Sequence, residues 1–172
     1  LQGKPYLFAL KRFSLAIIDE SSQIVEASIV GLLSAHSHSA SHSLAIERFV
    51  MVGDHKQLPA VVRQSVEESA VEESLLHDIG LLNCRESLFE RLLRKARKHN
   101  NHAIIGSLRY QGRMHFELAE FVSNSFYAKE QLTVVPLPHQ KEERLNYQVP
   151  SVDDLDEALK AHRVMFFPSP KN

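Results

Sequence analysis

The sequence predicts an α/β domain built on a parallel sheet, and two features of the chain carry that prediction. Short apolar runs rich in β-branched residues alternate with longer stretches of helical periodicity, and three of these runs are followed by polar motifs. Strands that alternate with helices favour right-handed crossovers and parallel pairing. Ligands of such sheets bind beyond the carboxyl ends of the strands, so we expect the three motifs to converge on one edge.

The composition is that of a folded protein. The 172 residues are 44% hydrophobic and 24% charged, which excludes wholesale disorder. The net charge of −1 gives no electrostatic argument for nucleic-acid binding, so such a function must be argued from motifs. The single cysteine, Cys84, allows no internal disulfide and suits a reducing compartment. We expect an intracellular location, cytoplasmic or, in a eukaryote, nuclear. No apolar run approaches the ~20 residues of a membrane span, and a start without Met or a signal peptide leads us to expect a segment of a longer protein.

The first half of the chain predicts two strands with a helix between them. Residues 13–18 and 49–52 are apolar runs whose length and β-branched content predict buried strands. Residues 23–34 have the apolar spacing of a helix, and residues 34–43 form a Ser- and His-rich tract that we interpret as a surface loop rather than a metal site. The histidines of this tract are His36, His38 and His42.

The middle of the chain predicts two helices. Residues 67–100 are rich in Glu, Leu, Arg and Lys, with a break near residues 80–83. The second helix begins at Ser87 with Glu90 three positions later, which is the pattern of a capping box. Its Lys/Arg-rich stretch, 91–98, is interpreted as a solvated helix face in preference to a phosphate-binding one.

The last part of the chain predicts a third strand and a further helix. Residues 103–108 predict the strand, and residues 116–126 predict the helix. Residues 136–156 are polar and contain proline, so they predict a loop or linker, and residues 164–167 predict the start of another strand.

Two adjacent carboxylates follow the first predicted strand. Asp19 and Glu20 end an apolar run, and burying such charges is costly unless a cation or a substrate compensates them. In phosphoryl-transfer sites the first carboxylate of such a pair holds Mg²⁺ and the second orients and deprotonates the attacking water. The alternative is an acidic cap for the next helix, because Asp and Glu are favoured at helix starts.

Polar motifs also follow the second and third predicted strands. After residues 49–52, Gly53 permits a tight turn and Gln57 offers both a donor and an acceptor that can sense a terminal phosphate. After residues 103–108, an Arg can clamp γ-phosphate oxygens bidentately. The alternatives are a generic Gly-Asp turn for the first motif and a solvated basic loop for the second.

Taken together, the motifs resemble those of superfamily 1 helicases of the nonsense-mediated-decay and splicing-associated group. That family has Asp-Glu-Ala-Ser/Thr-Gln where residues 19–23 read Asp-Glu-Ser-Ser-Gln, and Gly-Asp-His-x-Gln-Leu-Pro where residues 53–59 read Gly-Asp-His-Lys-Gln-Leu-Pro. It has Gln-Tyr-Arg-Met-His-Pro where residues 111–115 read Gln-Gly-Arg-Met-His. The flanking strings Ser-Leu-Phe-Glu-Arg-Leu and Ser-x-x-Phe-Tyr also match, at residues 87–92 and 123–127, so the resemblance runs in order over residues 13–132.

The resemblance implies a role for each motif residue. Asp19 would hold Mg²⁺, Glu20 would activate water, and Gln57 would contact the γ-phosphate of ATP or the attacking water. Gln111 would belong to the nucleotide-binding residues, and Arg113 would bind the nucleotide as an arginine finger.

The resemblance also implies a partial fold. The chain would be part of a RecA-like, P-loop NTPase helicase, with residues 1–135 forming the later part of the first RecA-like domain. Residues 136–172 would form the linker and the start of the second. The string Gly-x-x-x-x-Gly-Lys-Ser/Thr that cradles phosphates is absent from the sequence, so we expect the phosphate-binding loop to come from the rest of the helicase chain. The isolated segment is therefore expected neither to hydrolyse ATP nor to unwind a duplex. The partner that the resemblance implies for the whole helicase is single-stranded DNA or RNA.

Two positions depart from the family pattern. Gly112 stands where the family has tyrosine, and Phe116 stands where it has proline. These departures support an alternative, a degenerate helicase-like scaffold or nucleic-acid-binding module without ATPase activity. A second alternative is an ATP-dependent nuclease or restriction subunit that uses the same motor.

Overall fold

The structure is a computed structural model that describes residues 12–36, 44–135, 137–141 and 150–168. The chain divides into two compact units, Leu1–Ile105 and Gly106–Asn172, each described here by itself. No helix in the described ranges is long and apolar enough to cross a membrane. The expected division of a longer helicase between residues 135 and 136 stays a prediction.

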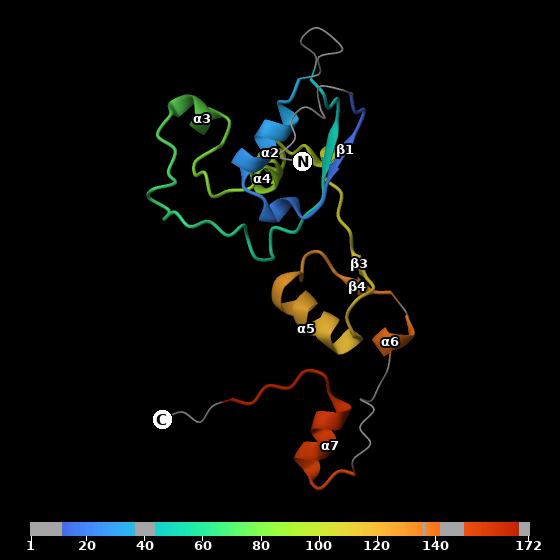
Figure 1. Ribbon diagram of the computed structural model, residues 1–172. Helices are drawn as coiled ribbons and strands as arrows, with labels where there is room; N and C mark the ends of the chain where they lie inside the picture. The colour runs from blue at the N-terminus through green and yellow to red at the C-terminus, as the bar shows by residue number, and fades with distance from the viewer. Residues whose placement is uncertain (1–11, 37–43, 136, 142–149, 169–172) are drawn as a thin grey trace. The chain divides into compact units, whose positions relative to one another are not determined.

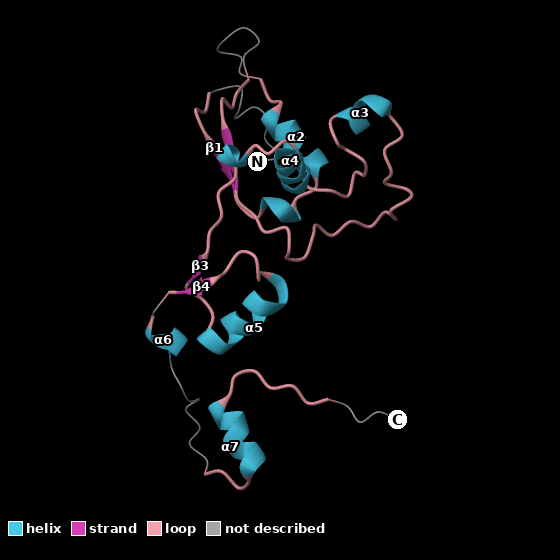
Figure 2. Cartoon of the chain, turned by 180° about the vertical axis from the view of Figure 1, so that it is seen from behind, coloured by secondary structure: helices cyan, strands magenta, loops and turns pink. Residues whose placement is uncertain are grey.

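The first unit pairs two parallel strands with helices, as Figure 1 shows. In β1 and β2 the residue Ile17 lies opposite Val50, which confirms the predicted strands and their parallel pairing. A long loop joins β2 to the next helix (Figure 2). The elements are β1 (Ala16–Ile18), η1 (Ser21–Gln23), α2 (Glu26–Leu33), β2 (Phe49–Met51), α3 (Ser74–Asp78), α4 (Leu88–Lys98) and η2 (His102–Ile104).

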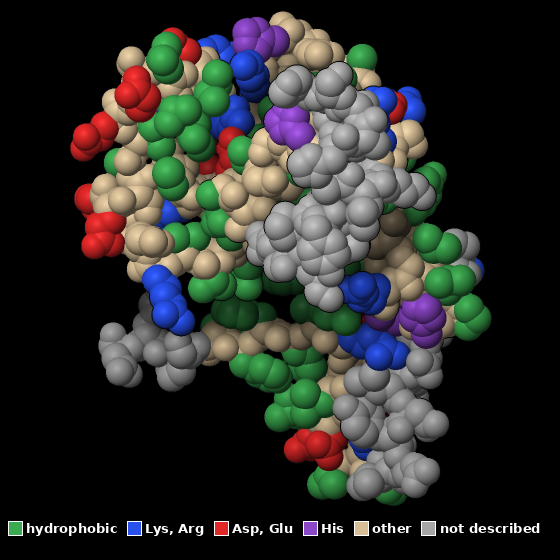
Figure 3. Space-filling model, turned by 45° about the horizontal axis from the view of Figure 1, so that its top comes forward, with side chains coloured by type: hydrophobic (Ala, Val, Ile, Leu, Met, Phe, Trp, Pro, Cys, Tyr) green, Lys and Arg blue, Asp and Glu red, His purple; other side chains and the backbone are tan. Residues whose placement is uncertain are grey.

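The two strands are less buried than predicted. Ile17 is 69% exposed and Val50 is 48% exposed, whereas Ala16 packs against the small core of Ala45 and Ile46. Successive side chains of a strand point to opposite faces of the sheet. A parallel strand is therefore fully buried only when other elements cover both faces of the sheet. The expectation of fully buried strands is therefore wrong for this unit. Figure 3 shows other exposed hydrophobic side chains on the face that it presents.

Helix α4 confirms the predicted cap and the predicted break. The Ser87 hydroxyl accepts the Glu90 backbone N–H (3.2 Å) and donates to the Glu90 carboxylate (2.8 Å). Gly80, at a positive φ of 85°, lies in the break between α3 and α4. The helix before the break is shorter than predicted, because only Ser74–Asp78 is helical.

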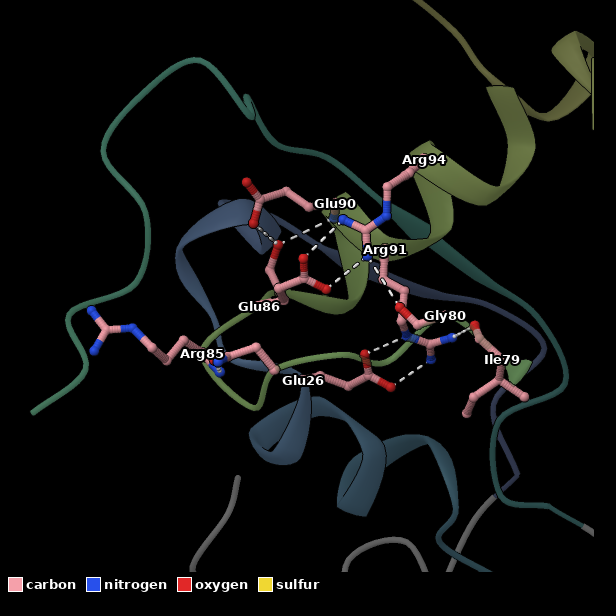
Figure 4. Close-up of polar contacts among 10 residues, drawn as sticks. Glu26, Ile79, Gly80, Arg85, Glu86, Glu90, Arg91 and Arg94 are labelled. Atoms are coloured by element: carbon pink, nitrogen blue, oxygen red, sulfur yellow. Dashed lines mark hydrogen bonds and ion pairs between the residues drawn. The ribbon is translucent and has the colours of Figure 1, made fainter. Parts of the chain in front are cut away.

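A buried ion pair joins α2 to α4. Arg91 of α4 donates from Nε (2.6 Å) and from Nη2 to the two carboxylate oxygens of Glu26 in α2, and its Nη1 donates to the carbonyl of Ile79 (2.8 Å) (Figure 4). The two side chains are 10% and 8% exposed, so the pair is shielded from water. The prediction that residues 91–98 form a solvated face is therefore wrong for Arg91.

The predicted third strand does not form. Within residues 103–108 the structure has only the end of η2, and Ile104 and Leu108 are 69% and 86% exposed. A strand is stabilised by pairing and by side-chain burial, and this segment has neither within the described residues. Apolar composition alone therefore gave a wrong prediction here.

The second unit has its own short parallel pair. Gln111 of β3 lies opposite Val134 of β4, and β4 was not predicted. Helix α5 has the predicted bounds. The elements are β3 (Tyr110–Gln111), α5 (Phe116–Phe126), β4 (Thr133–Val134), α6 (Pro138–Lys141) and α7 (Asp154–Ala161).

Two other predictions for this unit are wrong. The expected linker, residues 136–156, contains α6 and the start of α7, although part of it lies outside the described residues. Asp153 caps α7 by accepting the Asp156 backbone N–H (2.8 Å), a local signal that the sequence analysis missed. Residues 164–167 are not a strand, because no described segment pairs with them.

Candidate functional site

The first two motifs lie side by side at one end of the β1–β2 sheet. The Val52 backbone N–H donates to the Ile18 carbonyl (2.8 Å), and the Ser21 backbone N–H donates to the Val52 carbonyl (2.8 Å). The backbone pairing therefore continues past both strands into the loops that carry Asp19 and Asp54. This confirms the predicted convergence for these two motifs; the third motif belongs to the other unit.

Two buried serines tie these loops together. The Ser21 hydroxyl donates to the Val52 carbonyl (2.7 Å), and the Ser22 hydroxyl accepts the Asp54 backbone N–H (3.0 Å). Both serines are almost fully buried. This role of the two serines was not predicted, although small hydroxyl residues directly after a carboxylate pair were a usable signal.

Gly53 is required by a close approach. A Cβ at this position would lie 2.8 Å from the backbone nitrogen of Ser22 and 3.1 Å from the hydroxyls of Ser21 and Ser22. Its φ is not positive, so the turn conformation alone does not explain the glycine. The structure therefore replaces the expected reason, a tight turn, with contact between the two motif loops.

We expect Gly53→Ala to separate the loops, because its methyl group would meet backbone rather than a movable side chain. The expected cost is about 1–3 kcal/mol, the usual range for overpacking. The measurement is hydrogen exchange of the Ser21 and Asp54 amides, which should lose protection. Gly31→Ala is the matched control, because a Cβ there meets nothing within 4 Å and alanine favours a helix. Unchanged protection in Gly53→Ala would contradict this account.

Asp19 and Glu20 lie exposed on the first loop. Glu20 has left-handed backbone angles, φ 50° and ψ 33°, and its backbone N–H donates to Asp19 Oδ1 (2.9 Å). Its Oε2 accepts from Gln23 Nε2 (3.4 Å). Glu20 occupies the N-cap position of η1 without a capping hydrogen bond from its side chain, which counts against the alternative of a simple helix cap. Strained backbone at a non-glycine residue costs ~1–3 kcal/mol and is common at functional sites.

Gln57 is held by a carboxylate of its own motif. Its Nε2 donates to Asp54 Oδ2 (2.9 Å), its backbone N–H donates to the Asp54 carbonyl (3.2 Å), and the Lys56 backbone N–H donates to Asp54 Oδ1 (3.0 Å). Since a carboxylate only accepts, the amide nitrogen must face Asp54. The side-chain oxygen of Gln57, Oε1, has no partner among the described residues, so it is open to accept a hydrogen bond. The role of Asp54 was not predicted.

In the second unit, Gln111 shapes the loop that carries Arg113. The Gln111 Oε1 accepts the backbone N–H groups of Arg113 (3.1 Å) and Met114 (2.8 Å), and its Nε2 donates to the Met114 carbonyl (3.1 Å). The guanidinium of Arg113 is exposed and has no partner in the described part of the chain. Gln111 therefore orders the backbone from which Arg113 projects.

A buried glutamine supports the same loop. Gln140 is fully buried, and its Nε2 donates to the carbonyls of Gln111 (3.0 Å) and Met114 (3.1 Å). A Cβ on Gly112 would make only an ordinary contact, 3.6 Å from Leu137 Cδ1. The backbone thus does not demand glycine at position 112. The role of Gln140 was not predicted, because this residue lies in the expected linker.

No group of three or more His, Cys, Asp or Glu side chains in the described ranges could hold a metal ion. A Mg²⁺ ion bound with ATP needs only one or two carboxylates, because phosphates and waters supply its other ligands. Asp19 has the required oxygen chemistry, and only its Oδ1 is used by a described partner. His38 and His42 of the His-rich tract lie outside the described residues.

Glu117 connects the start of α5 to the segment after α7. Its Oε2 accepts the Arg163 backbone N–H (2.7 Å), and its Oε1 lies 3.6 Å from His162 Nδ1. The Arg163 hydrogen bond is the largest cause that lowers the pKa of Glu117 from its ordinary value of 4.5, with smaller contributions from His162 and His115 against the opposing effect of desolvation.

This lowered pKa gives a pH prediction. Because the folded-state pKa is depressed, the stabilisation by Glu117 is present above the ordinary value of 4.5 and is lost as pH falls through the lower folded value. We expect the hydrogen-exchange protection factor of the Arg163 amide to drop on acidification in that range. In Glu117→Gln the drop should disappear. A wild-type protection factor that does not change with pH would be the contrary result.

The comparisons with known proteins agree with a helicase motor. Residues 2–65, which include the first two motifs, match the family model described as "AAA domain". The chain is 31% identical over 136 residues to the DNA replication ATP-dependent helicase/nuclease DNA2 of Xenopus laevis, covering 78% of this chain and 11% of the relative. It is 28% identical over 169 residues to the protein of the same name in Gallus gallus, covering 94% of this chain and 14% of that relative. It is 29% identical over 151 residues to the protein of the same name in Mus musculus, covering 83% of this chain and 12% of that relative.

The chain thus spans only 11–14% of the length of these relatives. The matches and the parallel α/β arrangement support a segment of a superfamily 1-like helicase with a fold of the P-loop NTPase kind. They do not single out the nonsense-mediated-decay type.

Proposed function

We propose that this chain is a segment of the ATP-hydrolysing motor of a superfamily 1 helicase. The observation that carries the proposal is the junction of two motif loops at one end of the β1–β2 sheet, where Ser21 and Ser22 hold the Asp19–Glu20 loop against the Asp54–Gln57 loop. Ligands of parallel α/β sheets bind at this end of the strands. The junction therefore brings carboxylates and an amide to the place where a nucleotide is expected.

The first unit would supply the groups that act on water and metal. Asp19 would hold Mg²⁺, which neutralises charge on the phosphates of ATP, and Glu20 would accept a proton from the attacking water. Gln57 turns its side-chain nitrogen, Nε2, to Asp54 and would use its side-chain oxygen, Oε1, to orient that water beside the γ-phosphate. The strained backbone of Glu20 would keep its carboxylate at the loop edge instead of in a helix cap.

The second unit would supply the arginine finger. Arg113 would stabilise the negative charge that develops on the phosphate, and Gln111, in the same nucleotide-binding motif, would order its loop. The phosphate-binding loop and the second RecA-like domain would come from the rest of a longer, intracellular helicase chain. On this proposal residues 1–135 belong to the first RecA-like domain and residues 136–172 lead into the second.

We further propose single-stranded DNA as the favoured partner strand. The motif strings resemble those of a superfamily 1 group whose members act on DNA or RNA, so the resemblance alone leaves both strands open. The relatives are DNA replication helicase/nucleases by name, which favours DNA. The same names support a second candidate function, in which the helicase motor is joined to a nuclease domain.

The test is ATP hydrolysis by the longer helicase chain with single-stranded DNA, with single-stranded RNA and with neither. Turnover stimulated by DNA supports the proposal, and stimulation by RNA alone would favour the nonsense-mediated-decay type. Absence of turnover under all three conditions would overturn the motor in favour of the scaffold alternative. That alternative is supported by Gly112, which stands where the family has tyrosine. Cleavage of the labelled strand in the same reactions would identify the nuclease candidate.

A further inference from the structure

The basic residues of α4 fall into two groups. Arg91 and Arg94 are paired with carboxylates, Arg91 with buried Glu26 and Arg94 with Glu86 at 2.8 Å for each of two hydrogen bonds. Lys95, Arg97 and Lys98, in the last turn, are exposed and have no carboxylate partner among the described residues. The last turn is therefore a cationic surface without an internal counter-charge in the part of the chain that the structure describes.

These three cations form a single face of the helix. At about 100° per residue, Arg97, Lys98 and Lys95 span an arc of roughly 160°, and Ala96, which is buried, lies on the opposite side. A polyanion lying along the exposed side could therefore contact all three side chains at once.

The cationic turn also contacts the candidate catalytic loops. The Arg97 guanidinium donates to His55 Nε2 (3.4 Å), and His55 lies between Asp54 and Gln57. Helix α4 packs against η1, which contains the buried serines that join the two loops. Cations in a last helical turn also favour the helix dipole, but that effect requires no contact with a distant loop.

We propose that Lys95, Arg97 and Lys98 bind the phosphates of the single strand and that Arg97 transmits strand binding to Gln57 through His55. The inference builds on the proposed function, because it names the strand-binding surface of that motor and the route by which the strand stimulates hydrolysis. A phosphate that draws the Arg97 guanidinium away from His55 changes the contacts of the loop that orients Gln57. Lys95 and Lys98 supply affinity, and Arg97 supplies affinity together with the coupling.

The experiment measures binding of fluorescein-labelled oligothymidylate to the longer helicase chain by anisotropy over a salt series, without ATP. In Lys95→Gln/Lys98→Gln we expect about tenfold weaker binding at low salt and a slope of log affinity against log salt that is smaller by about 1.4, since each single-strand phosphate contact contributes ~0.7. The matched control is Arg48→Gln/Arg63→Gln, which removes two exposed arginines of the same unit. Its affinity and slope should equal those of the wild type.

The coupling is read from turnover at saturating strand. His55→Asn should bind the strand with wild-type affinity and show reduced stimulation of turnover, whereas Lys95→Gln/Lys98→Gln should regain stimulation once strand is saturating. Equal affinity and slope in the wild type and in Lys95→Gln/Lys98→Gln would overturn the binding surface, even if the wild type is a strand-stimulated ATPase. Weaker binding in that variant, with no turnover in the wild type, would support the surface and overturn the proposed motor.

Discussion

Replacing Glu20 with Gln in the longer helicase chain that we propose is expected to lower its strand-stimulated ATP turnover by about 10²- to 10⁴-fold, the range that a general base contributes. The amide keeps the size of the side chain and the hydrogen-bond acceptor that faces Gln23, so the left-handed loop should persist. What is lost is the group that, on the proposed function, would accept the proton of the attacking water. Turnover is measured by phosphate release under saturating ATP and strand.

The matched control for this variant is Glu72→Gln, an exposed glutamate of the same unit outside the motif loops. It should hydrolyse ATP at the wild-type rate. Nucleotide affinity, measured by equilibrium binding, should be similar in Glu20→Gln and in the wild type. If Glu20→Gln keeps turnover within about tenfold of the wild type, Glu20 is not the base, and the acidic pair serves another purpose.

Arg91→Met is expected to destabilise the first unit by about 3–5 kcal/mol, because it leaves the Glu26 carboxylate buried without its partner. It also removes the hydrogen bond to the Ile79 carbonyl, which joins α4 to the end of α3. The measurement is hydrogen exchange of the α2 and α4 amides, whose protection should fall together because the pair links the two helices (Figure 4).

Two further variants separate the ion pair from general damage to α4. The double variant Glu26→Leu/Arg91→Met removes both charges and should recover most of the lost protection, since apolar replacement of a buried pair is often neutral. Arg94→Met breaks the pair with Glu86, which is more exposed, and should cost only about 0–1 kcal/mol. Equal losses of hydrogen-exchange protection in Arg91→Met and Arg94→Met would show that burial of the Glu26–Arg91 pair adds nothing to its contribution to stability.

The sequence was sufficient wherever the signal is local. The bounds of α5 and the capping box of Ser87 and Glu90 were predicted from residues a few positions apart. The parallel pairing of the two strands that end in motifs was predicted from the alternation of strands and helices along the chain. Local signals failed where a partner was needed, as in residues 103–108, which are apolar but have no described strand to pair with. For α7 the local signal was present but was overlooked, because its capping residue Asp153 was attributed to a linker.

What only the tertiary structure decided is how distant residues work together. Ser22 and Asp54 are 32 positions apart, Arg97 and His55 are 42 apart, and Arg91 and Glu26 are 65 apart. The sequence by itself determined which chemical groups follow each strand: the carboxylates, the amide and the arginine. The fold determined that Gly53 must lack a side chain and that α4 presents, beside the motif loops, cations without a carboxylate partner in the described part of the chain. The physical reason is that propensity and capping act within a few residues, whereas close approach, burial and charge pairing depend on which segments the folded chain brings together.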